Sequence, residues 1–87
     1  MFRLTLYTRP GCHLCDAMKR IVDDIARDAP VSLREIDITG NGELERRFGV
    51  EIPVLAHGEH VLARVRTTRT RLLDALRNEA PQPPAQG

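Results

Sequence analysis

The feature that most constrains this chain is a change of hydrophobic period at Arg9-Pro10-Gly11. Before that point, residues 2–7 alternate apolar and polar side chains, which is the pattern of a half-buried strand. After it, apolar side chains recur at the spacing of a helix, and the stripe comprises Leu14, Ala17, Met18, Ile21, Val22 and Ile25. Proline removes a ladder donor and glycine permits a sharp turn, so the strand ends there. The sequence therefore predicts a strand that turns directly into an amphipathic helix, which Pro30 ends.

The middle of the chain predicts a second strand, a short helix and a hairpin. Residues 31–38 are rich in β-formers and lead into a glycine-containing turn, which is typical of a strand. Asn41 can cap a short helix over 43–48, because its side chain can accept a backbone N–H and acidic residues follow it. The apolar segments 53–56 and 61–65 flank a glycine turn, so they predict an antiparallel hairpin.

The last helix and the order of the elements set the fold class. Thr67 or Thr68 can cap this helix, and its inward residues would be Leu72, Leu73, Leu76 and Ala80. In the order β-α-β-α-β-β-α, the first two strands are joined by a helix and run parallel, with a right-handed crossover. We therefore expect an α/β fold over residues 1–80, with a mixed four-stranded sheet and helices on both faces. The proline-rich tail at 81–87 is predicted to be disordered.

Composition excludes several classes of protein. The chain has 87 residues, of which 41% are hydrophobic, enough for one core and too few for two. A net charge of +1 and an aromatic content of 3% argue against nucleic-acid binding through bulk charge or base stacking. No apolar run approaches the ~20 residues of a membrane span, and two cysteines cannot form the framework of a small secreted protein. We expect a monomeric, soluble, cytoplasmic domain with neither a nucleic-acid nor a membrane partner.

The sequence Cys12-His13-Leu14-Cys15, at the predicted strand-to-helix turn, is the one constellation that carries chemistry. Two thiols three residues apart on the first helical turn can close a disulfide. Cys12 stands at the exposed amino end, where free backbone N–H groups and the helix dipole favour a thiolate. Cys15 lies one turn further in and is suited to attack a mixed disulfide. Arg9 adds positive charge before the turn, and His13 adds more when it is protonated.

A second feature is Ile52-Pro53, which precedes an apolar run. In the expected topology, the third strand starts beside the amino end of the first helix. A cis bond there would hold the Ile52 backbone open for an extended partner chain. X–Pro bonds in folded proteins are cis in about 5–6% of cases, so the residues alone leave the isomer open. Tyr7, at the end of the first strand, can pack beside the site or donate a hydrogen bond to a substrate.

The segment Tyr7-Thr8-Arg9-Pro10-Gly11-Cys12-His13-Leu14-Cys15, the element order and Ile52-Pro53-Val54-Leu55 resemble a glutaredoxin-like protein of the thioredoxin superfamily. The similarity extends over roughly residues 2–78. It implies a thioredoxin-like fold and thiol–disulfide oxidoreductase activity. The roles that it implies are nucleophile for Cys12, resolving thiol for Cys15, glutathione contact for Arg9, substrate backbone contact for Ile52 and cis-proline for Pro53. Separately, we expect Tyr7, Pro10 and His13, which lie close to the pair in sequence, to modulate the site.

The chain departs from the glutaredoxin pattern at the positions that grip the γ-glutamyl end of glutathione. Glu51-Ile52 precedes the proline, Leu62-Ala63 stands where a Gly-Gly pair is usual, and Arg64-Val65-Arg66-Thr67-Thr68 follows where an acid is expected. We therefore expect glutathione to act as a possible reductant rather than as a tightly bound ligand. The expected substrate is a protein or small-molecule disulfide, recycled by glutathione or a thioredoxin-type reductase, with no metal or organic cofactor.

Two alternatives use the same residues differently. Cys12 and Cys15 can hold zinc or an iron–sulfur cluster across a dimer, or form a formal four-ligand set with His57 and His60. The domain can instead be a non-catalytic adaptor working through a basic face formed by Arg64, Arg66, Arg69 and Arg71. The alternation of residues 61–66 places Arg64 and Arg66 on one strand face, where they would discourage edge-to-edge aggregation or dock an acidic partner.

Overall fold

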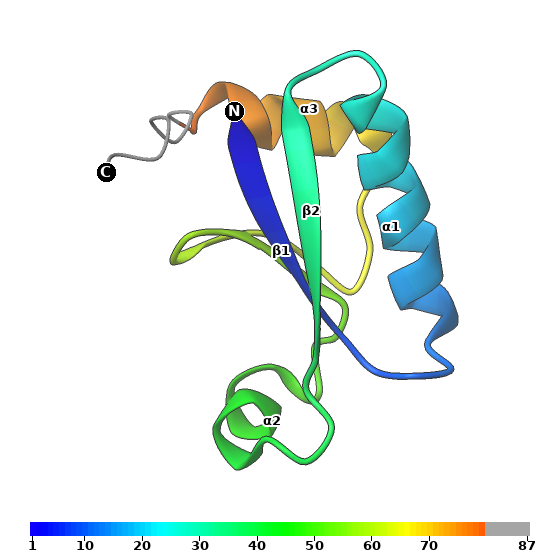
Figure 1. The fold of residues 1–87 in the computed structure, drawn as a ribbon, viewed down its shortest axis with the longest axis vertical. Helices are drawn as coiled ribbons and strands as arrows, with labels where there is room; N and C mark the ends of the chain where they lie inside the picture. The colour runs from blue at the N-terminus through cyan, green and yellow to red at the C-terminus, as the bar shows by residue number, and fades with distance from the viewer. Residues whose placement is uncertain (80–87) are drawn as a thin grey trace.

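Seven elements follow one another in the predicted order in the computed structural model, which describes residues 1–79 (Figure 1). They are β1 (Phe2–Thr8), α1 (His13–Ala26), β2 (Val31–Asp37), α2 (Gly42–Phe48), β3 (Val54–His57), β4 (His60–Arg64) and α3 (Arg69–Arg77). The α/β class is therefore confirmed. None of the helices in the described part of the chain has the length and apolar character needed to cross a bilayer. Ala80 and the tail at 81–87 lie outside the described residues.

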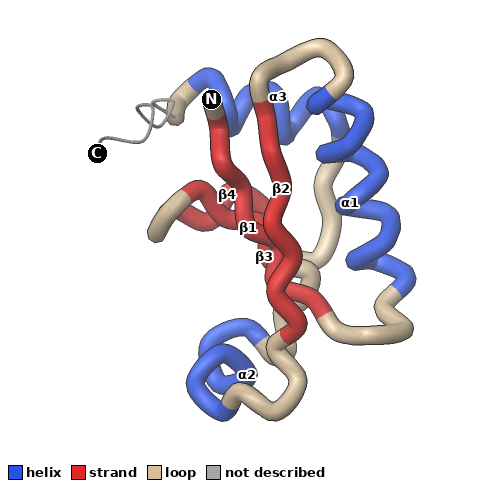
Figure 2. The backbone as a smooth tube through the Cα atoms, viewed as in Figure 1, coloured by secondary structure: helices blue, strands red, loops and turns tan. Residues whose placement is uncertain are grey.

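The sheet is mixed, as predicted, with the strand order β2-β1-β3-β4 (Figure 2). β1 pairs with β2 in parallel, and the pairs β1–β3 and β3–β4 are antiparallel. The register places Tyr7 opposite Val54 and Leu4 opposite His57. The carboxyl end of β1 therefore meets the start of β3 at one end of the sheet, and the β3–β4 hairpin turns toward the other end.

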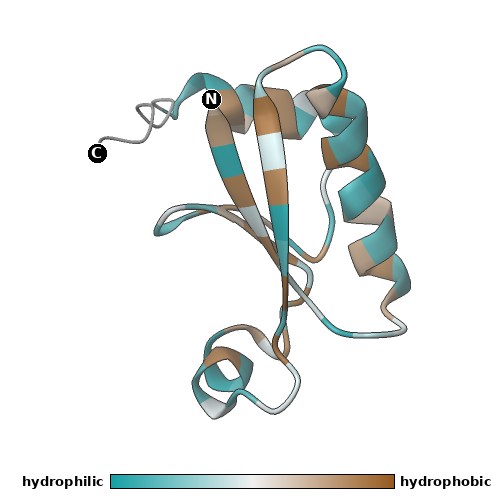
Figure 3. Ribbon diagram, in the orientation of Figure 1, coloured by the Kyte–Doolittle hydropathy of each residue, from teal (hydrophilic) through white to brown (hydrophobic). Residues whose placement is uncertain are grey.

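The two faces of the sheet carry separate apolar clusters, because side chains alternate along each strand. On one face, Leu6 of β1 and Leu55 of β3 pack against buried residues of α1 and α3. On the opposite face, Tyr7 and Val54 pack around Phe48 of α2. The alternation is visible as brown and paler or teal bands along β1 and β2 (Figure 3). Helices thus cover both faces, and α2 covers its face at the end where β1 leaves the sheet.

The helix cap predicted at Asn41 is confirmed, and Thr68 is the one of the two candidate threonines that caps α3. The Asn41 side chain accepts the backbone N–H of Leu44 at 3.1 Å, and the Thr68 hydroxyl accepts that of Arg71 at 3.1 Å. Each bond satisfies one of the N–H groups that the first turn of a helix leaves without an intrahelical partner. These local contacts fix where α2 and α3 begin.

The buried stripe of α1 differs from the predicted one. Leu14 is 37% exposed and Ala17 is also exposed, so these two members of the apolar stripe are not buried. Cys15, which is 3% exposed, belongs to the buried face together with Met18, Val22 and Ile25. The apolar stripe of α1 is therefore wider than the face that α1 buries.

The predicted strand over 61–65 ends one residue early, at Arg64. Val65 adopts a left-handed conformation with φ of 64°. Its N–H is shared between the carbonyl oxygens of Glu51 at 3.2 Å and Pro53 at 2.8 Å. These two bonds turn the chain out of the strand, so the prediction that Arg64 and Arg66 share one strand face was wrong.

Candidate redox site at the start of α1

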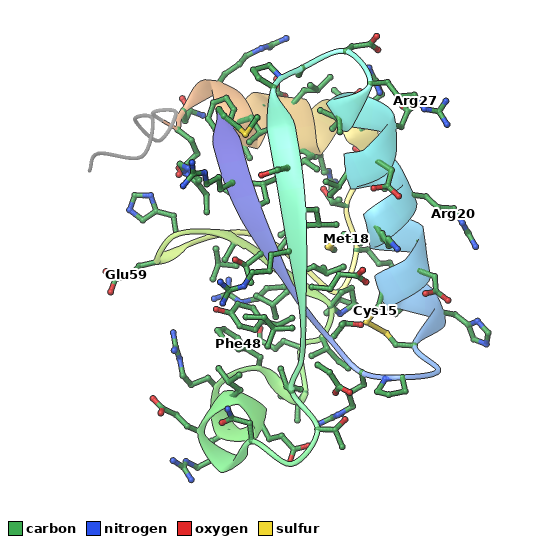
Figure 4. All side chains as sticks on the ribbon, in the orientation of Figure 1. Cys15, Met18, Arg20, Arg27, Phe48 and Glu59 are labelled. Atoms are coloured by element: carbon green, nitrogen blue, oxygen red, sulfur yellow. A yellow bond between two sulfur atoms is a disulfide. The ribbon has the colours of Figure 1, made fainter. Side chains whose placement is uncertain are left out.

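Cys12 and Cys15 form a disulfide at the junction of the β1–α1 loop and α1 (Figure 4). Their Cα atoms are 5.2 Å apart, within the usual range for a disulfide. Gly11, whose φ is 75°, turns the chain immediately before the pair, in a conformation that glycine adopts without a Cβ penalty. The local sequence therefore brings the two sulfur atoms together by a glycine turn and one turn of helix.

The two cysteines occupy unequal environments, as the sequence predicts. Cys12 is the N-cap of α1 and is partly exposed, and its sulfur accepts the backbone N–H of Cys15 at 3.0 Å. Cys15 is buried inside the first turn. The free N–H groups and the positive end of the dipole of α1 converge on Cys12. Asp16 in the same turn contributes the one acidic side chain there, which partly offsets this positive potential.

The Ile52–Pro53 peptide bond is cis, which confirms the isomer that the resemblance implies. Pro53 is fully buried and Ile52 is partly buried. Val54, the next residue, pairs with Tyr7 at the end of β1, so this loop lies beside the strand that leads to the disulfide. The Pro53 carbonyl oxygen is occupied by the N–H of Val65, which ties the loop before β3 to the loop after β4.

Arg9 is engaged with α2. Its guanidinium pairs with the Glu45 carboxylate at 3.1 Å and donates to the Gly49 carbonyl oxygen at 3.2 Å. A Cβ on Gly49 would collide with the Glu45 carbonyl oxygen and would lie 3.1 Å from Nη2 of Arg9, so the close approach of Gly49 to the Glu45 backbone favours a glycine at this position. The pKa of nearby Asp37 is lowered, mainly by hydrogen bonds from Thr39 and to a smaller extent by the Arg9 charge. The glutathione contact expected of Arg9 stays a prediction, and Glu45 is the competing partner.

The three residues predicted to modulate the site lie in different settings. The Tyr7 ring stacks on Phe48, with ring centroids 4.4 Å apart, so Tyr7 packs beside the site. Pro10 and His13 are exposed in the loop and at the first position of α1. Their effect on the thiols stays a prediction.

The histidines of the formal metal set do not meet the cysteines. His57 pairs with Leu4 near the start of β1, whereas Cys12 follows the end of that strand. His57 and His60 instead converge on Glu79, at the far end of the sheet. The four-ligand set was therefore wrong, and residues 1–79 contain no cluster of three or more His, Cys, Asp or Glu placed to hold a metal.

Sequence reasoning missed a groove that lies between α1 and the loop after β4. It has a volume of about 370 Å³ and is lined by Leu14, Ala17, Met18, Ile21, Val65, Arg66 and Thr67. The signal that could have revealed it is the width of the apolar stripe on α1. The stripe has more apolar residues than one buried face requires, and the surplus, Leu14 and Ala17, lines the groove.

The fold and the site together define a thioredoxin-like protein with a Cys-x-x-Cys pair. The fold is built on a mixed sheet, and the Cys-x-x-Cys pair lies at the amino end of α1. The cis-proline loop lies beside this pair. The model of the Glutaredoxin-like domain (DUF836) matches residues 3–79, and the chain therefore belongs to this family. The resemblance seen in the sequence is confirmed.

Solved structures agree with this assignment. A structural genomics target protein from X. campestris, solved by X-ray crystallography, is 28% identical with a TM-score of 0.76, over 88% of this chain and 99% of that one. A protein from Nitrosomonas europaea, solved by NMR in solution, is 27% identical with a TM-score of 0.73, over 86% and 89% of the two chains. Thioredoxin 1 from Thermosipho africanus, 16% identical with a TM-score of 0.59 over 86% and 90%, shares the fold. No curated protein matches the chain significantly.

Proposed function

We propose that this protein is a dithiol–disulfide oxidoreductase that uses Cys12 as the nucleophile and Cys15 as the resolving thiol. The observation that carries the proposal is the asymmetry of the pair: Cys12 caps α1 and is partly exposed, whereas Cys15 is buried within bonding distance of it. A thiolate at a helix N-terminus is stabilised by backbone N–H groups and by the helix dipole.

The reaction begins when the Cys12 thiolate attacks one sulfur of a substrate disulfide. A Cys12–substrate bond forms, the substrate S–S bond breaks, and the first substrate thiolate leaves. Cys15 then loses its proton and attacks the Cys12 sulfur, which forms the Cys12–Cys15 disulfide and releases the second substrate thiolate. The substrate gains two electrons and two protons, and the protein dithiol loses them. Glutathione or a thioredoxin-type reductase then reduces the protein disulfide.

The cis-proline loop and Arg9 are proposed to contact the substrate. The loop that holds Ile52 and Pro53 lies beside the strand that leads to the disulfide, so the Ile52 backbone is a candidate for pairing with an extended substrate. The chemistry needs no metal or organic cofactor. A reducing cytoplasm suits it, because disulfides there are mostly transient and catalytic.

A redox titration tests this function. The purified protein is equilibrated in glutathione buffers of stepped potential, acid-quenched, alkylated and read by intact mass. We expect one transition between dithiol and disulfide forms within the range known for related proteins, about −120 to −270 mV. Cys12→Ser is the control that removes the pair. Thiols that never pair, or that pair only after a chelator has stripped a metal, would overturn the proposal in favour of the metal-binding alternative.

A further inference from the structure

The face of the sheet that α2 covers in part carries two arginines and two hydroxyl groups close together. In the parallel pairing of β1 with β2, Arg3 lies opposite Ser32. Two residues further on, Thr5 lies opposite Arg34. Because side chains alternate along a strand, these four share the face of Tyr7, against which α2 packs. Figure 2 shows α2 beside one end of the sheet, so the part of this face that holds the two arginines has no helix over it.

A pocket with a volume of about 420 Å³ lies over these four polar residues. The rest of its lining comes from Leu4, Leu33 and Gly58. The side chains of the two leucines belong to the apolar cluster on the opposite face, so the main chain of β1 and β2 forms the floor. A Cβ placed on Gly58 would meet nothing within 4 Å, so the wall at the hairpin turn is open. Small-molecule sites have volumes of roughly 300–1,000 Å³, and this pocket falls within that range.

No acidic side chain among residues 1–79 lines this pocket. Glu35 follows Arg34 in the chain but points to the other face of the sheet, where it pairs with Lys19 at 3.4 Å. Glu59, in the hairpin turn, lines a separate pocket together with Glu79. The positive charge in the pocket is therefore not neutralised from within the described part of the chain.

The two arginines are close enough to act on one anion. Strands lie about 4.8 Å apart and rise about 3.3 Å per residue, which puts the Cα atoms of this diagonal pair roughly 8 Å apart. The ion pairs between residues 1–79 engage other arginines, and neither Arg3 nor Arg34 takes part in one. Protection of a sheet edge accounts for Arg34, on the edge strand β2. It does not account for Arg3, because β1 has a strand on each side.

We propose that this face of the sheet binds the phosphate monoester group of a small molecule, held between Arg3 and Arg34. Each guanidinium presents N–H donors in a planar fork that matches two phosphate oxygens, and the hydroxyls of Thr5 and Ser32 can donate to the others. A bound dianion also relieves the repulsion between the two cations. The site lies beyond the redox function, because Arg3 is near the start of β1 whereas Cys12 follows its end.

Titration with glycerol 2-phosphate, followed by the backbone amide signals of the isotope-labelled protein in a phosphate-free buffer of low ionic strength, tests this inference. We expect saturable shifts of the amides of Arg3, Ser32 and Arg34, and none with glycerol. A peptide of aspartate and glutamate is the second probe. If the peptide binds this face more tightly than the ester, the small-molecule assignment is overturned. Shifts that do not saturate, or that spread equally over the other arginines, would overturn the site itself.

Removal of one cation at a time sharpens the test. Arg3→Gln and Arg34→Gln should each weaken binding of the ester about fivefold, which corresponds to about 1 kcal/mol for an exposed charged contact. The matched controls are Arg20→Gln and Arg27→Gln, which remove the same charge on the outer side of α1 and at its C-cap, where Figure 4 shows both side chains pointing away from the sheet. Equal weakening in all four variants would mean long-range attraction and would overturn the site.

An internal carboxylate provides an independent readout. Ser32→Glu places an acid opposite Arg3 on the exposed edge strand, where it competes with the ester, so binding should be lost. Ser32→Gln adds a side chain of the same size without charge and should keep most of the binding. Unchanged affinity in Ser32→Glu would overturn the proposal, and well-dispersed amide signals check that each variant is folded. Disulfide reduction by Cys12 should proceed at the wild-type rate in all these variants, so the phosphate site and the redox function succeed or fail separately.

Discussion

The ion pairs at the two ends of the sheet differ in how deeply they are buried. At the hairpin end, the His57 and Glu79 side chains are 9% and 12% exposed, and His57 Nδ1 lies 2.7 Å from the Glu79 carboxylate. At the disulfide end, the side chains of the Arg9–Glu45 pair are 37% and 40% exposed, and those of the Arg64–Glu51 pair are 51% and 42% exposed. Leaving a buried polar group without a hydrogen-bonding partner costs free energy, because water cannot solvate it. Breaking a half-exposed ion pair costs little, because water solvates both of the separated groups.

The buried pair at the hairpin end therefore contributes to the stability of the fold, whereas the exposed pairs at the disulfide end contribute little to it. Glu79 accepts hydrogen bonds from His57 and from His60 at 3.2 Å, and so ties the residues after α3 to the β3–β4 hairpin. Because a carboxylate only accepts, each Nδ1 carries the proton. The Nε2 of His57 is buried without a partner in the described residues, and the Phe2 and His57 rings pack in a T-shaped arrangement with centroids 5.6 Å apart. The disulfide end has exchangeable ion pairs instead, which leaves its cations available to a substrate.

The largest expected effect is on the thiols, and it should leave stability nearly unchanged. Cys12→Ser should abolish disulfide reduction, because the attacking sulfur is gone. Cys15→Ser should instead accumulate a mixed disulfide on Cys12, visible by intact mass as a covalent substrate adduct. Thermal unfolding of both variants, compared with the reduced wild-type protein, checks that the fold persists. Complete loss in both variants with no trapped adduct would contradict the assigned roles.

At the hairpin end, Glu79→Gln should destabilise the protein without slowing thiol chemistry. The pKa of Glu79 lies below its ordinary value of 4.5, chiefly because His57 hydrogen-bonds to the carboxylate, with His60 adding to the effect. A lowered folded-state pKa stabilises the fold above the unfolded value, and this stabilisation is lost as pH falls through the folded value. The wild type should therefore lose more stability than the variant on acidification below about pH 4.5.

Thermal unfolding from pH 7 down to pH 3 measures this effect, and we expect a melting point a few degrees lower for Glu79→Gln at neutral pH. The double variant His57→Leu with Glu79→Leu is the control. It removes both polar partners at once, so it should recover part of the stability that the single change loses. Parallel pH profiles for the wild type and Glu79→Gln would show that this cluster contributes nothing to acid stability.

Val65→Gly should raise the stability of the protein and slow its reduction of an apolar peptide disulfide. Glycine adopts the left-handed conformation freely, so relief of the backbone strain should raise the free energy of unfolding by about 1 kcal/mol. The greater conformational entropy of glycine in the unfolded chain reduces this gain. The apolar wall of the groove is lost, so reduction of an apolar peptide disulfide should slow. Denaturant unfolding and peptide kinetics give the two readouts. Val65→Ala is the matched control, because it shortens the side chain without relieving the backbone.

The sequence predicted those features of the structure that are determined by residues close together in the chain. The turn at Gly11, the caps at Asn41 and Thr68 and the order of the elements depend on residues within a few positions, and all are confirmed. The cis isomer at Pro53 followed from family resemblance, since local preference favours trans. The unequal placement of the two thiols likewise followed from the position of one helix terminus.

What the sequence could not predict depends on contacts between distant residues. Val65 has a side chain that favours strand, yet hydrogen bonds to Glu51 and Pro53 turn it into the left-handed region. The partner of Arg9 lies 36 residues away on α2, and the partner of His57 lies 22 residues away, beyond α3. Such pairings are set by tertiary packing, so periodicity and capping signals carry no information about them.

The smallest expected effect is that of Glu45→Gln, and it bears most directly on the contrast between the two ends. The Arg9–Glu45 pair is more than a third exposed on both sides, so its loss should change the free energy of unfolding by less than about 1 kcal/mol. Arg9 keeps its hydrogen bond to the Gly49 carbonyl oxygen and is no longer neutralised by a carboxylate. The reduced variant should therefore react up to about threefold faster with oxidised glutathione, which is anionic.

Denaturant unfolding and the second-order rate constant with oxidised glutathione measure the two effects of Glu45→Gln. Glu43→Gln is the matched control, because it removes an acidic charge from the same first turn of α2 without contacting Arg9. A loss of stability as large as that of Glu79→Gln would show that the Arg9–Glu45 pair also holds the fold together. In that case the two ends of the sheet would not divide stability from chemistry, and Arg9 would be a structural residue rather than one available to a substrate.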